Sequence, residues 1–295
     1  MAAHQLVSQQ SQLEPGEHLI AHNGVKLHCI VSGRGPLLAV QAPGRGIGSD
    51  YLRNGLAPLE DHFTLLFYDP RGSGKSTRPA SEAQMSTSDM VEDLEQMRRY
   101  WGLKSINVLG HSHGGAIALG YAERYPDHIQ RLILVDSCLP GFDASAIVRQ
   151  FINRRQDDVR YVSSIDSLRQ PVPKNEDQFQ KYFMAIQPFY FYDPHKNVPA
   201  FLETTAGNPS SWCYHASADS DRLKPRRQSE TLSAIRARTL ILVGSEDPFC
   251  SPVVADQIHQ GLQQSKLVVL REAGHFPWIE QPREFFDMVH NFLLC

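Results

Sequence analysis

The sequence of 295 residues predicts an α/β fold, in which a mostly parallel central sheet is flanked by helices and a helical segment is inserted. Short apolar, β-branched runs alternate with longer runs of helical periodicity, a pattern typical of parallel sheets covered on both faces. The alternation stops between about residues 139 and 232 and then resumes. We therefore expect a core made of residues 1–138 and 233–295, and an insertion at 139–232.

The elements follow in order along the chain. Asn23-Gly24 is a strong hairpin-turn signal, so residues 17–31 are predicted to form two antiparallel strands. Runs of strand length then occupy residues 37–40, 64–68, 106–109, 132–135, 239–243 and 267–270. Runs with helical character occupy residues 51–59, 86–101, 116–124, 144–155 and 282–294. In the second of these, apolar residues at helical spacing mark a buried stripe: Met90, Leu94, Met97 and Trp101.

A Gly-x-Ser-x-Gly segment, Gly110-His111-Ser112-His113-Gly114, lies between a predicted strand and a predicted helix. This context is typical of a nucleophile elbow, a tight turn that pushes a serine hydroxyl into a pocket. The glycines are needed because a Cβ on either neighbour would clash across the strained turn. The alternative is a glycine-rich turn with an idle serine. We expect Ser112 to be a catalytic nucleophile.

A serine nucleophile needs a base, and the base needs an acid that orients it. Asp247 follows the predicted strand at 239–243, and His275 follows the strand at 267–270, so both should reach the same sheet edge as Ser112. The order Ser, Asp, His along the chain is the one such folds require. Asp136 and Glu246 are rival candidates for the acid. We expect Ser112, Asp247 and His275 to form a catalytic triad.

With these segments, and with Tyr68-Asp69-Pro70-Arg71-Gly72-Ser73-Gly74 after the strand at 64–68, the chain resembles the α/β-hydrolase superfamily. Within it, the chain is similar to the proline iminopeptidase-like and epoxide-hydrolase-like branch. The resemblance implies an α/β-hydrolase fold whose insertion at 139–232 is a helical cap over the active site. Epoxide hydrolases need a carboxylate at the elbow, so Ser112 argues against that activity.

The segment after the third strand departs from the family pattern of His-Gly followed by a donor of an oxyanion N–H. Here the residues are Gln41-Ala42-Pro43-Gly44-Arg45. One alignment makes Arg45 the donor, and the other would use Pro43, which has no N–H to give. We therefore expect the oxyanion hole to use the N–H groups of His113 and Arg45, with Gly44 as the neighbouring candidate.

The insertion is rich in aromatic side chains. Four aromatic residues are candidates for substrate binding: Phe189, Tyr190 and Trp212 in the insertion, and Phe276 beside the predicted base. Each aromatic of the insertion could equally be ordinary core. The insertion offers no carboxylate whose spacing singles it out as an anchor for a substrate ammonium group; Glu203, Asp219 and Asp221 are the possibilities.

The sequence therefore predicts a serine hydrolase that cleaves an ester, thioester or lactone of a small, largely apolar molecule through an acyl-enzyme. A proline iminopeptidase-type aminopeptidase is the main alternative. An acyltransferase or another specialised-metabolism enzyme on the same triad, and a non-catalytic ligand-binding member of the fold, also stay open. The mechanism requires no cofactor and no metal.

Composition limits the partners. The formal net charge of −3 gives no case for nucleic acid, and no apolar run approaches the roughly 18 residues of a membrane helix. The five cysteines are odd in number and have no Cys-x-x-Cys spacing, which is typical of a reducing, cytoplasmic setting. We expect a small-molecule substrate, and no nucleic-acid or membrane partner; the sequence does not indicate an oligomeric state.

Overall fold

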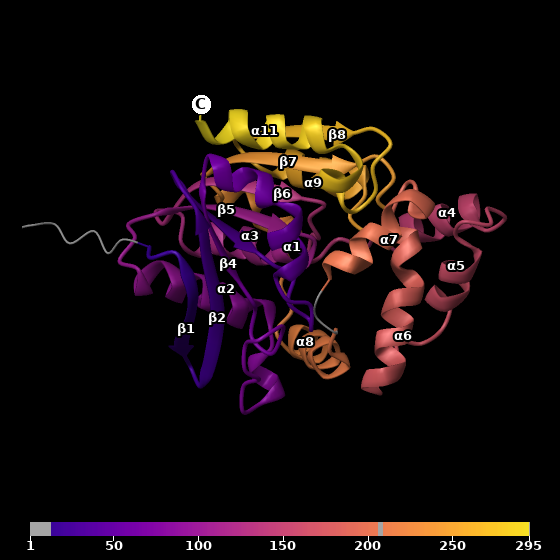
Figure 1. Cartoon of the computed structure of the whole chain (residues 1–295), viewed down its shortest axis with the longest axis horizontal. Coiled ribbons are helices and arrows are strands. Elements are labelled where there is room, and N and C mark those ends of the chain that lie inside the picture. The colour runs from indigo at the N-terminus through magenta and orange to yellow at the C-terminus, as the bar shows by residue number, and fades with distance from the viewer. Residues whose placement is uncertain (1–12, 206–208, 295) are drawn as a thin grey trace, which may run out of the picture.

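The computed structural model describes residues 13–205 and 209–294 (Figure 1). One eight-stranded sheet forms its centre, in the order β1-β2-β4-β3-β5-β6-β7-β8. The strands are β1 (Gly16–His22), β2 (Val25–Gly33), β3 (Leu37–Gln41), β4 (Thr64–Tyr68), β5 (Ile106–His111), β6 (Ile129–Val135), β7 (Arg238–Gly244) and β8 (Ser265–Leu270). From β4 to β8 all neighbours are parallel, and β2 is antiparallel to both β1 and β4. The predicted α/β class is confirmed.

The hairpin at the start of the sheet forms as predicted. Asn23 and Gly24 have φ angles of 44° and 79°, and His22 pairs with Val25 across the turn. Two consecutive residues with positive φ suit the right-handed twist of the flanking strands. The turn therefore sets the register that makes Val25 and Leu27 core residues, each at most 1% exposed.

Helices cover both faces of the sheet. One face packs against α2 (Thr87–Tyr100), α3 (His113–Arg124) and α9 (Pro252–Gly261), and the other against α1 (Asp50–Gly55), α10 (Pro277–Glu280) and α11 (Pro282–Leu294). The described residues also form five short 3₁₀ helices: Ala57–Asp61, Glu82–Gln84, Gln187–Tyr190, Gln228–Glu230 and Leu232–Ala234. None of the described helices has the length and apolar character that a membrane span needs.

Two helix predictions can be compared in detail. The stripe on α2 is buried as expected, and Ser86 caps the helix in a reciprocal capping box with Asp89. The helix predicted at 51–59 is shorter: α1 ends at Gly55, and residues 57–61 form a 3₁₀ helix instead. Pro58 explains the break because proline has no N–H to continue the α-helical ladder.

Between β6 and β7 the described residues form helices and no strand. These are α4 (Ser145–Arg155), α5 (Val162–Leu168), α6 (Glu176–Ile186), α7 (Pro194–Thr204) and α8 (Ser211–Leu223). In Figure 1, α4, α5 and α6 stand to one side of the sheet, while α8 lies below it. Residues 139–232, called here the helical insertion, have a small core of their own around Phe151, Tyr161 and Phe189.

Candidate active site

Ser112 lies in a strained turn between β5 and α3, with φ of 57° and ψ of −125°. A Cβ on Gly110 would stand 2.5 Å from the carbonyl oxygen of Gly114, and one on Gly114 would stand 2.2 Å from that of Gln41. These are backbone atoms that cannot move aside. Both glycines are therefore required by the close approach of the chain to itself, as the sequence indicated.

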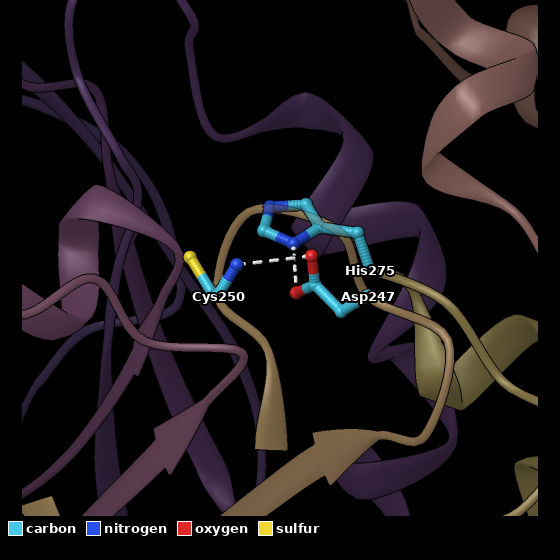
Figure 2. Close-up of side chains that lie close together, drawn as sticks. All are labelled: Asp247, Cys250 and His275. Atoms are coloured by element: carbon cyan, nitrogen blue, oxygen red, sulfur yellow. Dashed lines mark hydrogen bonds and ion pairs between the residues drawn. The ribbon is translucent and has the colours of Figure 1, made fainter. Parts of the chain in front are cut away.

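The two other triad candidates meet each other at the same edge of the sheet. His275 Nδ1 and Asp247 Oδ2 are 2.6 Å apart, and both side chains are buried (Figure 2). The second oxygen of Asp247 accepts the backbone N–H groups of Phe249 and Cys250 at 2.8 and 3.0 Å. Burial raises the pKa of Asp247, but His275 lowers it by charge and hydrogen bonding, and the net pKa lies below its usual value. Asp247 is therefore ionised and suited to orient an imidazole.

The rival acids have partners other than His275, and Asp136 lies against Asp247 itself. Asp136 accepts the backbone N–H of Gly244 at 2.9 Å, and burial together with the nearby Asp247 raises its pKa well above the ordinary value. Glu246 forms an ion pair with Arg155 at 2.8 Å. The carboxylate that pairs with His275 is that of Asp247, so the geometry favours Asp247 as the triad acid.

Asp247, Cys250 and His275 also bring three potential metal-ligand atoms within 4.8 Å of one another (Figure 2). Hydrogen bonds already use most of the atoms that could bind a metal ion. The imidazole Nδ1 pairs with one carboxylate oxygen, and the other oxygen accepts two backbone N–H groups. The arrangement is that of an ionised carboxylate that orients an imidazole.

The loop after β3 carries the oxyanion candidates. Gly44 and Arg45 have φ angles of 68° and 55°, and both line a cavity together with Ser112 and His113. His113 is the first residue of α3, so its N–H has no partner one turn back in the helix. Its ring Nδ1 lies 2.7 Å from the carbonyl oxygen of Pro43 and donates to it, since a carbonyl can only accept. This bond holds the loop against the elbow.

Burial, reinforced by the charge of Arg45, lowers the pKa of His113 to about 3, so its ring is neutral. The carboxylate of Asp221, on α8, accepts hydrogen bonds from Arg45 Nη2 at 3.0 Å and from the backbone N–H of Thr87 at 2.7 Å. Hydrogen bonds thus occupy the carboxylate of Asp221 and join it, through Arg45, to the loop after β3.

The other two candidate anchors lie at the surface. Asp219 is exposed and pairs with Arg222, and Glu203 is exposed on α7. Neither they nor Asp221 line the two cavities that contain Ser112. An ammonium anchor at these three positions is not supported by the structure.

Ser112 and His275 are shared by two adjoining cavities. The first, called here the small chamber, has a volume of about 60 Å³ and is walled by Tyr51, Phe183, Phe201 and Phe276. The second, the large chamber, has a volume of about 280 Å³ and is walled by Phe179, Tyr182, Tyr214 and Phe249. Among the described residues, no Asp or Glu lines either chamber.

The four predicted binding aromatics divide evenly. Tyr190 and Phe276 line the chambers. Phe189 does not: it is fully buried in the core of the helical insertion, in edge contact with Tyr161. Trp212, on α8, does not line them either: the Arg78 guanidinium covers its ring, with the guanidinium carbon 4.7 Å from the ring centroid. The structure thus places these two candidates away from the chambers, because an aromatic-rich sequence does not distinguish a packed core from a cavity wall.

The residues that hold His275 carry no signal in the sequence. The Tyr51 hydroxyl lies 2.6 Å from His111 Nδ1, and His111 Nε2 lies 2.8 Å from the carbonyl of His275. That carbonyl must accept, so His111 donates from Nε2 and receives the tyrosine hydroxyl at Nδ1. Burial, together with His275, lowers the pKa of His111 well below its usual value, which keeps the ring neutral. His111 occupies a variable position of the elbow pattern, so the pattern assigns it no role.

Glu280 is a second residue without a sequence signal. Its carboxylate accepts the N–H of Gly274 at 2.7 Å and the N–H of Asp193 at 2.9 Å. One bond is made by the loop that carries His275, and the other by the helical insertion. Glu280 therefore ties the candidate base to the insertion.

Comparisons with known proteins identify the fold family. A family model described as the alpha/beta hydrolase fold matches residues 40–282. The chain belongs to the α/β-hydrolase fold family. A proline iminopeptidase of Pestalotiopsis fici, PfmaB, is 27% identical over 269 residues, which cover 88% of this chain and 92% of that protein. The family is one of hydrolases, and this relative supports the predicted resemblance to the proline iminopeptidase-like branch.

Two solved structures share the fold. A proline iminopeptidase-related protein of Thermus thermophilus superposes with a TM-score of 0.74 at 21% identity, covering 96% of this chain and 98% of that one. An esterase from Exiguobacterium antarcticum superposes with a TM-score of 0.69 at 21% identity, covering 96% of this chain and 100% of the esterase. Proteins with different named substrates thus share this fold, so the substrate must be argued from the site.

Proposed function

We propose that this protein is a serine hydrolase that cleaves an uncharged ester, thioester or lactone. Ser112 attacks the acyl carbon while His275 removes the hydroxyl proton, and Asp247 stabilises the resulting imidazolium. The N–H groups of His113 and Arg45 receive the oxyanion of the tetrahedral intermediate. His275 then returns the proton to the leaving group, and an acyl-enzyme remains on Ser112. Water, deprotonated by the same imidazole, releases the acid and restores the serine.

The observation that carries the uncharged substrate is the absence of Asp and Glu from the described lining of both chambers. A substrate ammonium placed there would lose its hydration without a paired anion, at a cost of several kcal/mol. An apolar group instead gains about 25 cal/mol for each Å² of surface that it buries. The aromatic walls therefore favour a neutral substrate.

The two volumes define the shape of that substrate. One water-sized group takes up roughly 10–15 Å³ of cavity volume measured in this way. The small chamber, at about 60 Å³, therefore holds roughly four to six heavy atoms. The large chamber, at about 280 Å³, holds several times more. We expect a substrate with a short apolar group on one side of the carbonyl and a larger, aromatic or polycyclic group on the other.

Proline iminopeptidase activity is the second candidate, and the name of the Pestalotiopsis fici relative favours it. Among the residues that the structure describes, one carboxylate lines a hollow that adjoins the small chamber. Asp50 lines a hollow of about 30 Å³ that shares Ile47, Tyr51, Phe183 and Thr205 with the small chamber. An aminopeptidase would need this carboxylate, or one brought in by movement of the insertion, to receive the substrate ammonium.

One matched pair of substrates separates the two activities. Prolyl 4-nitroanilide is compared with the same anilide whose amine is acetylated, and both are compared with 4-nitrophenyl acetate and butanoate. We expect the esters to be cleaved, and the free amine to give no advantage over the acetylated amide. A strong preference for the free amine that disappears in Asp50→Asn, but persists in the exposed control Asp219→Asn, would establish the peptidase and overturn our proposal.

A second experiment tests the chamber assignment. Phe201→Leu enlarges the small chamber, whereas Phe179→Leu makes the same change in the wall of the large one. We expect Phe201→Leu to extend the longest acyl or alcohol chain that is accepted by one to two carbons, and Phe179→Leu to leave that limit unchanged. An identical chain-length profile in both variants would contradict the assignment.

A further inference from the structure

Two cysteines that are far apart in the sequence meet beside the candidate triad. Cys138 follows β6, Cys250 follows β7, and their Sγ atoms are 3.3 Å apart. Both side chains line the large chamber together with Ser112 and His275. Neither takes part in the hydrolytic steps described above. Cys29 and Cys213, the other cysteines that the structure describes, lie in the core.

The backbone N–H of each of these two cysteines donates a hydrogen bond to a triad candidate. The N–H of Cys138 donates to the carbonyl oxygen of Ser112 at 3.0 Å. The N–H of Cys250 donates to Asp247 Oδ1 at 3.0 Å, as Figure 2 shows. A change in the position of either cysteine therefore reaches the nucleophile or the acid directly.

We propose that Cys138 and Cys250 form a reversible disulfide site that reacts with small-molecule disulfides of the glutathione type and controls the hydrolase. A disulfide needs an S–S distance of about 2.05 Å, so the sulfurs must approach by roughly 1.2 Å from the observed separation. The cysteines are on two loops at the edge of the sheet, and the movement is shared between them. The loss of activity rests on the proposed function; formation of the bond does not.

The two thiols have different roles in the reaction. The hydrogen bond from Cys250 lowers the pKa of Cys138 to about 7 against the opposing effect of burial, and it raises that of Cys250. Cys138 is also the more accessible, since it lines a second recess of about 370 Å³ beside Arg45 and Asp221. Cys138 is therefore the attacking thiolate and Cys250 the resolving thiol.

The reaction proceeds in two exchanges. The Cys138 thiolate attacks one sulfur of the small disulfide, forms a mixed disulfide and releases the first small thiol. The Cys250 thiol then loses its proton, attacks the Cys138 sulfur and releases the second small thiol. Two cysteine thiols are oxidised by two electrons in total, and one small disulfide is reduced to two thiols. Dithiothreitol reverses the process.

The consequence for catalysis follows from the backbone bonds. Drawing the sulfurs together displaces Cys138 or Cys250 by a sizeable fraction of an ångström, and with it the carbonyl of Ser112 or the carboxylate of Asp247. Misplacement of about 1 Å can cost about 100-fold in rate. We expect the oxidised protein to lose at least about tenfold in kcat/KM for 4-nitrophenyl acetate.

The test incubates the full chain with oxidised glutathione and follows intact mass, peptide mapping and ester hydrolysis. We expect a mass decrease of about 2 Da, a peptide linking Cys138 to Cys250, and a loss of activity that dithiothreitol restores. Cys250→Ser should accumulate glutathione on Cys138, because the resolving thiol is gone. Cys138→Ser should remain unmodified at Cys250. Cys29→Ser and Cys213→Ser are controls that should form the bridge like the wild type.

Ser112→Ala separates this proposal from the proposed function, because it should form the bridge while having no esterase activity to lose. A bridge between any other pair of cysteines would overturn the proposal. So would the absence of the bridge under conditions that oxidise a reference dithiol, or a complete bridge with unchanged ester hydrolysis in an active wild type.

Discussion

Replacing Asp247 by asparagine tests the acid of the proposed triad, and the structure indicates how the variant should fail. Asp247 Oδ1 accepts two backbone N–H groups, from Phe249 and Cys250. In Asp247→Asn the amide oxygen must keep that position, since an NH₂ group there would face two donors. The NH₂ group is then directed at His275 Nδ1, 2.6 Å away in the wild type.

The tautomer of the base follows from this orientation. With a donor facing Nδ1, the neutral imidazole must carry its proton on Nε2, and it can no longer remove the proton of Ser112. In a well-studied protease, the same change in a Ser-His-Asp triad lowers kcat about 10⁴-fold. At about 1.36 kcal/mol for each factor of ten, the loss here should be about 5.4 kcal/mol of transition-state stabilisation.

Asp136→Asn is the matched control, because Asp136 is equally buried and also follows a strand end. Its oxygen accepts the N–H of Gly244, and an amide oxygen can accept the same bond. We expect Asp136→Asn to retain kcat within about tenfold. The assay is hydrolysis of 4-nitrophenyl acetate, with circular dichroism to confirm folding. Loss of activity in Asp136→Asn with retention in Asp247→Asn would refute the tautomer argument and move the acid to the end of β6.

Two further predictions concern the base and the stability of the fold. In Gly274→Ala the new Cβ would lie 2.2 Å from the carbonyl oxygen of Tyr190, which accepts the backbone N–H of His275 at 2.7 Å. Because this clash displaces the base, we expect kcat to fall at least about tenfold. Gly24→Ala is the control: a Cβ there meets no neighbouring atom, so the variant should keep full kcat. Burial raises the pKa of Glu95, but hydrogen bonds from Arg98, Arg99 and Tyr121 outweigh it and lower the pKa to about 2. The ionised group therefore stabilises the fold above the unfolded pKa of 4.5, and this stabilisation disappears as the pH falls toward 2. Thermal unfolding should show Glu95→Gln less stable than the wild type at pH 7, with a difference that shrinks below pH 4.5; a difference independent of pH would contradict this assignment.

The parts of the fold that could be predicted from the sequence are those set by local rules. The turn at Asn23-Gly24, the capped helix after Ser86 and the elbow around Ser112 each depend on residues adjacent in the chain. Their backbone geometry follows from glycine freedom, capping and periodicity. The pairing of Asp247 with His275 could also be anticipated, since both follow neighbouring parallel strands.

The features that the sequence missed depend on contacts between distant segments. Phe189 and Trp212 were expected at the site, yet one packs inside the insertion and the other under Arg78. Asp221 was considered as a substrate anchor, yet its carboxylate accepts a hydrogen bond from Arg45 in the loop after β3. The two-chamber division and the meeting of Cys138 with Cys250 likewise arise from tertiary packing, for which one sequence carries no local signal.

Covalent labelling of the nucleophile tests the proposed mechanism most directly. The wild-type protein is treated with a fluorophosphonate, which phosphonylates activated serines, and is then examined by intact mass and peptide mapping. We predict one adduct, on Ser112, formed rapidly in the wild type and absent from Ser112→Ala. We also predict that Asp247→Asn reacts far more slowly than Asp136→Asn. An adduct on another residue, or an unmodified wild-type protein, would contradict the claim that Ser112 is an activated nucleophile.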